Sequence, residues 1–245
     1  MSRLHSILRL SIIAIAACLS SCIDSREEYW LEPDGSGRAE ITYHLPAAAA
    51  AVHGGESGLR EMVLDFLNGT PEIANSACEV VIEEARVRIK INVAFDSALA
   101  LRDLRNGESM KSLPAAATHL AGEVTAGLHG RTLEYTRKIS ASKALPGAAF
   151  LSATQLEGHR MTYIMHLPSA PMESNATRVE NAGRTLVWDI PLSQALKSPV
   201  VTWFKMQIPT PWSLVATIAI PLSGVAYATV LLRRRKLRNR FPLEI

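Results

Sequence analysis

The sequence predicts an α+β domain, with an antiparallel sheet and helices on one face, plus a cleaved signal peptide and one C-terminal transmembrane helix. Three observations support this prediction. Several segments alternate apolar and polar residues as half-buried strands do, two segments repeat apolar residues at spacings of three and four, and an uncharged apolar block stands near each end. The expected parts are a lipoprotein signal peptide at 1–21, an extracytoplasmic α+β domain at 22–210, a transmembrane helix at 211–232 and a basic cytoplasmic tail at 233–245.

The N-terminal block has the organisation of a secretory signal. Arg3 and Arg9 form a basic region, and Leu10–Leu19 is apolar but too short to span a bilayer well. The block ends in Leu-Ser-Ser-Cys22, which resembles the bacterial lipobox. The resemblance implies that the Cys22 thiol receives a diacylglyceryl group, a lipid anchor with acyl chains such as palmitate, and that cleavage leaves Cys22 as the first residue. An ordinary signal peptide, or an uncleaved anchor, with an incidental cysteine is the alternative.

The C-terminal block, Trp212–Leu232, is 21 residues without a charge, about the length that crosses a hydrocarbon core. A buried core helix is the alternative, but soluble helices rarely lack polar positions for so long. Trp212 marks one membrane interface, and a basic run marks the other: Arg233, Arg234, Arg235 and Lys236. Because positive residues stay cytoplasmic, we expect the tail inside and the domain outside the inner (cytoplasmic) membrane of a bacterium.

Charge and cysteine content agree with this topology. Of the 26 basic residues, two lie in the signal and six lie in the tail. Of the 23 acidic residues, one lies in the tail. The segment 23–211 therefore carries 18 basic and 22 acidic residues. The basic character of the chain therefore belongs to its ends and does not indicate nucleic acid. Once Cys18 is removed and Cys22 is acylated, Cys78 is alone, which predicts a small buried hydrophobe without a disulfide.

The first elements of the domain are a hairpin and a helix. Tyr29–Leu31 and Arg38–Leu45 flank the turn Pro33–Gly37, and the second arm alternates as a half-buried strand. Apolar residues from Leu59 to Leu67 define one helical face, which Asn68-Gly69 closes.

The later elements are mainly strands. The segments Val80–Glu83 and Arg86–Phe95 form a second hairpin, and Ser97–Arg105 forms a short helix. The remaining predicted strands are Glu123–Leu128, Arg131–Ile139, Arg160–Leu167, Thr185–Ile190 and Val200–Ile208. The pattern at 106–122 is weak and predicts loop or partial helix, and 143–157 is a connection rich in small residues for which the sequence predicts no defined structure.

No constellation in the sequence indicates catalysis, a cofactor or a metal. His159 and His166 lie seven apart and face opposite ways on a regular strand, and no Cys/His cluster has ligand spacing. Glu27-Glu28 is a neighbouring pair of carboxylates whose side chains point apart, so a solvated edge is favoured over a catalytic pair. Asp34–Gly37 is favoured as a turn over a calcium loop. Thr202–Met206, with Trp203, suits a domain resting on lipid headgroups; the alternative is simply the final strand.

Several passages resemble the LppM-like bacterial lipoproteins. Leu31–Ile41 is similar to their opening strand-turn-strand. Val93–Ser97 and Leu101–Leu104 are similar to a passage in the middle of these proteins. The stretch Leu167–Trp188, with its proline, asparagine and tryptophan residues, is similar to the segment before their final anchor. The order of lipobox, external α+β domain, single span and basic tail also matches. A lipid-binding role has been proposed for the mycobacterial namesake, and the resemblance implies no functional residue here.

The sequence thus favours a non-enzymatic, membrane-anchored envelope lipoprotein with membrane lipids as partners. Its external domain is expected to bind a lipid or amphiphile through an apolar groove at the outer leaflet of the cytoplasmic membrane. The alternative is a scaffold or accessory subunit that docks onto an envelope protein complex through a sheet edge or through Gly224 and Ala228 in the span. An envelope enzyme is a third class, for which no site residues are found.

Overall fold

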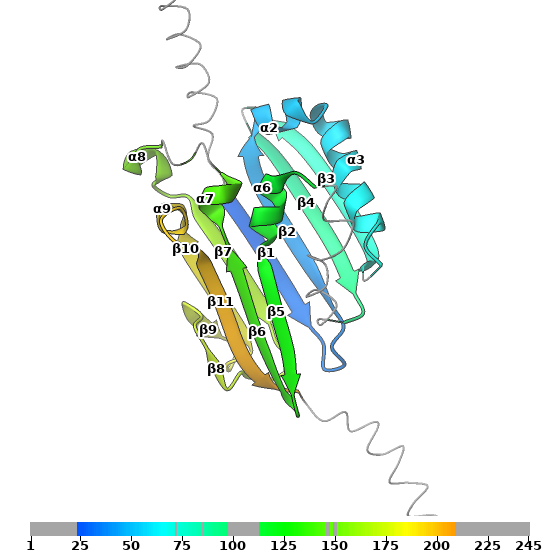
Figure 1. Cartoon of the computed structure of the whole chain (residues 1–245), viewed down its shortest axis with the longest axis vertical. Coiled ribbons are helices and arrows are strands. Elements are labelled where there is room, and N and C mark those ends of the chain that lie inside the picture. The colour runs from blue at the N-terminus through cyan, green and yellow to red at the C-terminus, as the bar shows by residue number, and fades with distance from the viewer. Residues whose placement is uncertain are drawn as a thin grey trace, which may run out of the picture. The chain divides into compact units, whose positions relative to one another are not determined.

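The domain consists of two β-sheets with helices packed beside them (Figure 1). The computed structural model describes residues 24–71, 73–84, 86–97, 113–145, 148 and 151–208. The larger sheet has the strand order β3-β4-β2-β1-β7-β10-β9. Its strands are β1 (Asp24–Leu31), β2 (Gly37–Pro46), β3 (Ile73–Glu83), β4 (Arg86–Phe95), β7 (Arg160–His166), β9 (Arg178–Glu180) and β10 (Thr185–Pro191).

The smaller sheet has the order β5-β6-β11-β8. Its strands are β5 (Glu123–His129), β6 (Thr132–Ile139), β8 (Glu173–Ser174) and β11 (Val200–Gln207). The described helices are α2 (Ala47–Val52), α3 (Gly55–Asn68), α6 (Ala115–Ala121), α7 (Ala141–Ala144), α8 (Ala153–Leu156) and α9 (Leu192–Ala195).

The predicted hairpins are confirmed. β1 pairs with β2, β3 with β4 and β5 with β6, all antiparallel, and the turn after β1 is closed by Ser36, whose amide and hydroxyl donate to the Asp34 carboxylate at 3.0 and 2.7 Å. The segment 34–37 is therefore a turn, as the sequence indicated. Position 37, which follows the turn, requires glycine because a Cβ there would come within 2.3 Å of the Trp30 carbonyl oxygen.

The prediction of a purely antiparallel sheet is wrong. β1 and β7 are parallel neighbours in the centre of the larger sheet, so that sheet is mixed, and the strands form two sheets rather than one. Residue alternation predicts which face of a strand is buried, and short turns predict hairpin partners, but neither specifies the pairing of strands that lie more than 100 residues apart. The α+β class itself is supported.

Several boundaries also differ from the prediction. The described residues contain eleven strands, two more than the nine segments predicted as strands. The additional strands, β8 and β9, have too few residues to show alternation. The segment 106–122 contains helix α6, and the segment 143–157 contains α8 and overlaps the end of α7. The helix predicted at Ser97–Arg105 falls mostly on residues 98–112, which lie outside the described residues.

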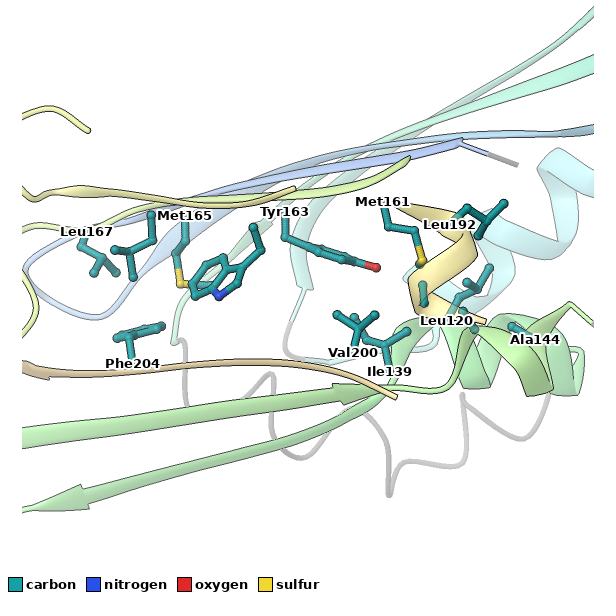
Figure 2. Close-up of a cluster of buried hydrophobic side chains, with 14 of the residues drawn as sticks. Leu120, Ile139, Ala144, Met161, Tyr163, Met165, Leu167, Leu192, Val200 and Phe204 are labelled. Carbon is teal, nitrogen blue, oxygen red and sulfur yellow. The ribbon is translucent and has the colours of Figure 1, made fainter. Parts of the chain in front are cut away.

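The packed core lies between the two sheets. Figure 2 shows Met161, Tyr163 and Met165 of β7 pointing toward Ile139, Val200 and Phe204 of the smaller sheet. Many of these side chains are almost completely buried, with Met161 and Ile139 at 0% exposure and Phe204 at 1%. We call this inter-sheet cluster the packed core.

Helix α3 covers the other half of the same sheet face. Its residues Leu59, Val63 and Leu67 are buried against β3 and β4, as the spacing predicted. The Glu56 carboxylate in its first turn accepts a hydrogen bond of 2.6 Å from the Ile82 amide of β3. Cys78 is buried in this second cluster, and burial raises the pKa of its thiol, which confirms the prediction of a small buried hydrophobe.

No helix within the described residues is long and apolar enough to span a membrane. The span predicted at Trp212–Leu232 lies outside those residues.

Candidate functional site

A largely apolar cavity of about 510 Å³ lies over the half of the sheet that α3 covers. This volume falls within the range of about 300–1,000 Å³ that is typical of small-molecule sites. The cavity wall combines the inner face of β2 and β4, one side of α3, helix α6, and parts of β5 and β6.

The sheet wall follows from strand alternation. On β2 the residues Ala39, Ile41, Tyr43 and Leu45 point inward, and on β4 the alternate residues from Ile89 to Phe95 do the same. The partner residues Ile41 and Ile91 stand directly opposite each other in the centre of this wall. These are the faces for which the sequence predicted burial.

The helical wall of the cavity includes residues of α3 that lie beside its buried face, which is formed by Leu59, Val63 and Leu67. Met62 and Phe66 are only partly buried and line the cavity, whereas Leu59, Val63 and Leu67 also contact the sheet. The opposite wall is built from small residues of α6, such as Ala116 and Ala117. Small side chains on one wall leave space that larger ones would fill.

A buried ion pair forms one end of the cavity. Arg137 of β6 binds Glu27 of β1 in bidentate fashion, with Nη1 to Oε2 at 2.6 Å and Nη2 to Oε1 at 3.2 Å. The side chains are 6% and 1% exposed, respectively. This pair joins the two sheets across the molecule, 110 residues apart in sequence.

Two tyrosines complete the shell around the carboxylate. The Tyr29 hydroxyl donates to Glu27 Oε2 at 2.6 Å, and the Tyr43 hydroxyl donates to Oε1 at 2.8 Å. Tyr29, Tyr43 and the Glu27–Arg137 pair are called the polar end below. Tyr163 packs beneath it, with the Arg137 guanidinium 5.2 Å from the Tyr163 ring centroid.

The C-terminus of α6 supplies the remaining partners of Arg137. Its Nε donates to the Ala121 carbonyl at 2.8 Å and its Nη2 to the Leu120 carbonyl at 3.1 Å. These carbonyls stand at the negative end of a helix, which favours a cation. Gly122 ends the helix with φ of +74°, in the region that glycine adopts most easily.

The electrostatics of the polar end follow from burial and from this pairing. Burial alone would lower the pKa of Arg137, but the neighbouring Glu27 carboxylate raises that pKa well above its ordinary value. Burial, and secondly the Glu27 charge, raise the pKa values of Tyr29 and Tyr43 well above 10.0. Arg137 therefore stays protonated, and the hydroxyls of Tyr29 and Tyr43 stay neutral, at neutral pH.

The geometry can hold an apolar molecule. In the described part of the chain, no group of three or more His, Cys, Asp or Glu side chains could bind a metal ion. His159 bonds to Asp24 and His166 to Glu28 through ring nitrogens at 3.0 and 2.8 Å, so the two histidines serve separate pairs.

The interpretation of Glu27-Glu28 as a solvated edge is half wrong. The two side chains do point to opposite faces, and Glu28 pairs with Arg26 and His166 on the outer face. Glu27, however, has no exposed surface and stands in the centre of the sheet between Ile41 and Tyr163. Glu27 and Arg137 each stand at a strand position whose neighbours two residues away are uncharged and face the core. A charged residue at such a position indicates a buried, paired charge, and this pattern could have revealed the pair in the sequence.

Most of the proposed membrane-contact residues lie outside the described residues: Cys22, Trp212, Arg233, Arg234, Arg235 and Lys236. Trp203 lies within β11, half-buried, on the side of the strand opposite to Phe204. Its backbone amide donates to the Asn175 side chain at 2.8 Å. Thr202–Met206 thus belongs to the final described strand, and a role at a membrane interface stays a prediction.

Asn175 bridges the two sheets. Its Oδ1 also accepts a hydrogen bond of 2.9 Å from Trp188 of β10, and its Nδ2 donates to the Val201 carbonyl of β11 at 2.8 Å. The proline-asparagine-tryptophan stretch that carried the family resemblance therefore contains residues that contact one another.

Comparison with known proteins gives distant structural similarity. No family model and no curated protein matches the sequence. Among solved structures, the chain is similar to the folded domain of Mycobacterium tuberculosis LppM, determined by NMR, with 15% identity, a TM-score of 0.49, and coverage of 77% of this chain and 91% of that one. It is also similar to the Mu homology domain of zebrafish (Danio rerio) Fcho1 with a bound Eps15 peptide, with 8% identity, a TM-score of 0.25, and coverage of 79% and 82%. Similarity at this level establishes neither family membership nor a shared activity.

Proposed function

We propose that this protein is a non-enzymatic lipoprotein of the bacterial envelope whose external domain binds a lipid or amphiphile in the cavity beside α3. The observation that carries the proposal is the cavity itself, which combines largely apolar walls from β2, β4 and α3 with the polar end around Glu27 and Arg137. An amphiphile has the same division into a long apolar part and a short polar part.

The walls favour a hydrocarbon chain over a polar metabolite. Ile41, Ile91 and Val93 of the sheet line the cavity together with Met62 and Phe66 of the helix, and none of these side chains carries a hydrogen-bond donor or a strong acceptor. A polar metabolite would lose its hydration there without replacement, whereas apolar surface gains about 25 cal/mol for each Å² removed from water.

The anchoring scheme predicted by the sequence gives this function its location. A lipid at Cys22 and a span at Trp212–Leu232, with Arg233–Lys236 inside, would hold the domain at the outer leaflet of the cytoplasmic membrane, where lipids are the abundant apolar ligands. A reporter fused after Ile245 should be cytoplasmic, and a Cys22→Ser variant should lose its acyl label. A periplasmic reporter would contradict the orientation.

Photo-crosslinking tests the proposed binding. The full chain is placed in phosphatidylcholine nanodiscs and exposed to an oleyl probe that carries a diazirine in its chain, and mass spectrometry then maps the labelled peptides. We expect labelling of peptides from Gly55–Asn68 and Arg86–Phe95, which line the cavity. Ile91→Trp, which fills the centre of the cavity, should reduce this labelling by about ten-fold.

The matched control is Ile82→Trp, the same substitution at a residue of β3 that is 40% exposed and lies outside the cavity lining. It should leave the labelling unchanged. Equal labelling of the wild type and of Ile91→Trp would refute lipid binding in the cavity. A protein crosslinked reproducibly to the full chain in its native membrane, together with that result, would favour the alternative of a docking subunit.

A further inference from the structure

The hydrogen bonds at the polar end leave no donor or acceptor of the ion pair unused. An ionised carboxylate offers about four lone-pair sites. On Glu27 all four are filled, because Oε1 accepts from Arg137 Nη2 and Tyr43, and Oε2 accepts from Arg137 Nη1 and Tyr29.

Arg137 is equally saturated. A guanidinium has five N–H donors. Nε is bound to Ala121, Nη2 is shared between Glu27 and Leu120, and Nη1 points to Glu27 Oε2 and, at 3.4 Å, to the Tyr29 hydroxyl. The pair is therefore neutral as a unit, and the guanidinium has no donor left for an anionic group.

The rest of the described lining offers no compensating charge next to this end. Apart from the ion pair, the titratable side chains in the lining are the three tyrosines and His53, which lies between α2 and α3. A charged headgroup drawn in beside the ion pair would lose its hydration and find no counter-ion among the described lining residues, so its binding is disfavoured.

Tyr135 supplies the available hydrogen bond. It lines the cavity from β6, two residues from Arg137, and its ring stacks on Phe204 with centroids 5.2 Å apart. Among the described residues its hydroxyl has no hydrogen-bond partner, unlike those of Tyr29 and Tyr43. Burial raises the pKa of this hydroxyl, so it stays a neutral donor and acceptor.

From these contacts we infer that the cavity selects amphiphiles with an uncharged, hydrogen-bonding headgroup, such as a hydroxyl or an ester. The headgroup forms its hydrogen bond with the Tyr135 hydroxyl. Charged headgroups are bound less well. This inference rests on the proposed function. It deepens that function by assigning a ligand class and a specificity residue, Tyr135.

Three probes with the same photoreactive oleyl chain test the inference. Their heads are glycerol, which is neutral, sulfate, which is anionic, and trimethylammonium, which is cationic. Each is added to the full chain in phosphatidylcholine nanodiscs, and labelling of the Gly55–Asn68 and Arg86–Phe95 peptides is expressed relative to the Ile91→Trp background. The glycerol probe should label at least about ten-fold more strongly than either charged probe.

Two variants sharpen the test. Tyr135→Phe removes only the free hydroxyl and should lower labelling by the glycerol probe about five-fold while leaving the charged probes unchanged. Glu27→Gln keeps the shape of the side chain but leaves Arg137 without a counter-ion, so labelling by the sulfate probe should rise about ten-fold, with no rise for trimethylammonium.

The outcomes separate the two claims. If no probe labels the cavity peptides above the Ile91→Trp background, the proposed function fails. If the cavity peptides are labelled but a charged probe matches the glycerol probe, or Tyr135→Phe changes nothing, the proposed function stands and the inferred selectivity is overturned. Should Glu27→Gln fail to fold, the comparison of the three probes on the wild type and on Tyr135→Phe still decides.

Discussion

The two halves of one sheet face are packed differently. Beside β7 and β10 the larger sheet is covered by the smaller sheet, and side chains such as Met161, Leu186 and Phe204 pack closely between the two sheets. Beside β2 and β4 the same face is covered mainly by α3 and α6, and a cavity of about 510 Å³ remains.

The difference shows how the choice of covering element creates a site. Two facing sheets each present rows of side chains that interdigitate at a spacing of about 10 Å. A helix contacts a sheet along a single stripe, so Leu59, Val63 and Leu67 pack closely whereas Met62 and Phe66 at the margin of the stripe remain partly uncovered. The apolar residues of both halves obey the same alternation.

The boundary between the halves is where polar groups gather. Four of the five tyrosines in the chain, Tyr29, Tyr43, Tyr135 and Tyr163, surround the Glu27–Arg137 pair. A polar cluster in this position connects both sheets and also closes one end of the cavity.

The largest expected effect comes from breaking the ion pair at this boundary. Arg137→Met leaves the Glu27 carboxylate buried without its counter-ion, which should lower the free energy of unfolding by about 3–5 kcal/mol. Urea denaturation of the full chain in a mild detergent, followed by tryptophan fluorescence, measures this loss.

The double variant Glu27→Leu/Arg137→Met should regain most of that stability, because it removes both charges together. Lys205→Met breaks the exposed pair with Glu134, whose atoms are 3.0 Å apart, and should cause no measurable change. If Lys205→Met lowered the free energy of unfolding as much as Arg137→Met, the claim that the buried Glu27–Arg137 pair stabilises the fold more than an exposed pair would be contradicted.

A matched pair of methionine truncations compares the two halves directly. Met206→Ala in the packed core, where the side chain is 2% exposed, should destabilise the protein by about 2–5 kcal/mol. Met62→Ala on the cavity wall should cost less than about 1.5 kcal/mol, because its side chain already borders empty space and loses fewer contacts. The same denaturation measurement checks both, and equal losses would show that the two halves are packed to the same density.

The smallest effect concerns alkaline pH and the tyrosines of the boundary. Burial and the Glu27 charge raise the pKa values of Tyr29 and Tyr43, so the folded state holds these protons more tightly than the unfolded state does. The stabilisation is complete below pH 10.0, the ordinary value, and is lost as the pH rises above it, by at most about 1.4 kcal/mol per pH unit for each tyrosine.

Denaturation midpoints between pH 9 and pH 11, measured for the wild type and for Tyr43→Phe, check this expectation. The variant should be less stable at pH 9, because Glu27 loses a hydrogen bond, but its stability should fall less steeply with pH. Parallel slopes for the two proteins would contradict the assignment.

The walls of the cavity were largely predictable, and its polar end was not. Alternation in Arg38–Leu45 and Arg86–Phe95 predicted which face of each strand is buried, and the spacing of Leu59, Val63 and Leu67 predicted the helix that covers them. The sequence predicts a solvated edge for Glu27, because its partner, Arg137, is brought to it only by the packing of one sheet on the other.

The sequence alone determined the hairpins, the buried faces of β2 and β4, the helix at α3 and the burial of Cys78, because these depend on neighbours within a few residues and on the periodicity of apolar side chains. Only the tertiary structure decided that β1 lies parallel to β7, that the strands divide into two sheets, and that Glu27 meets Arg137. The physical reason is that pairing between distant segments depends on the fit of whole packed layers, which no local pattern of residues encodes.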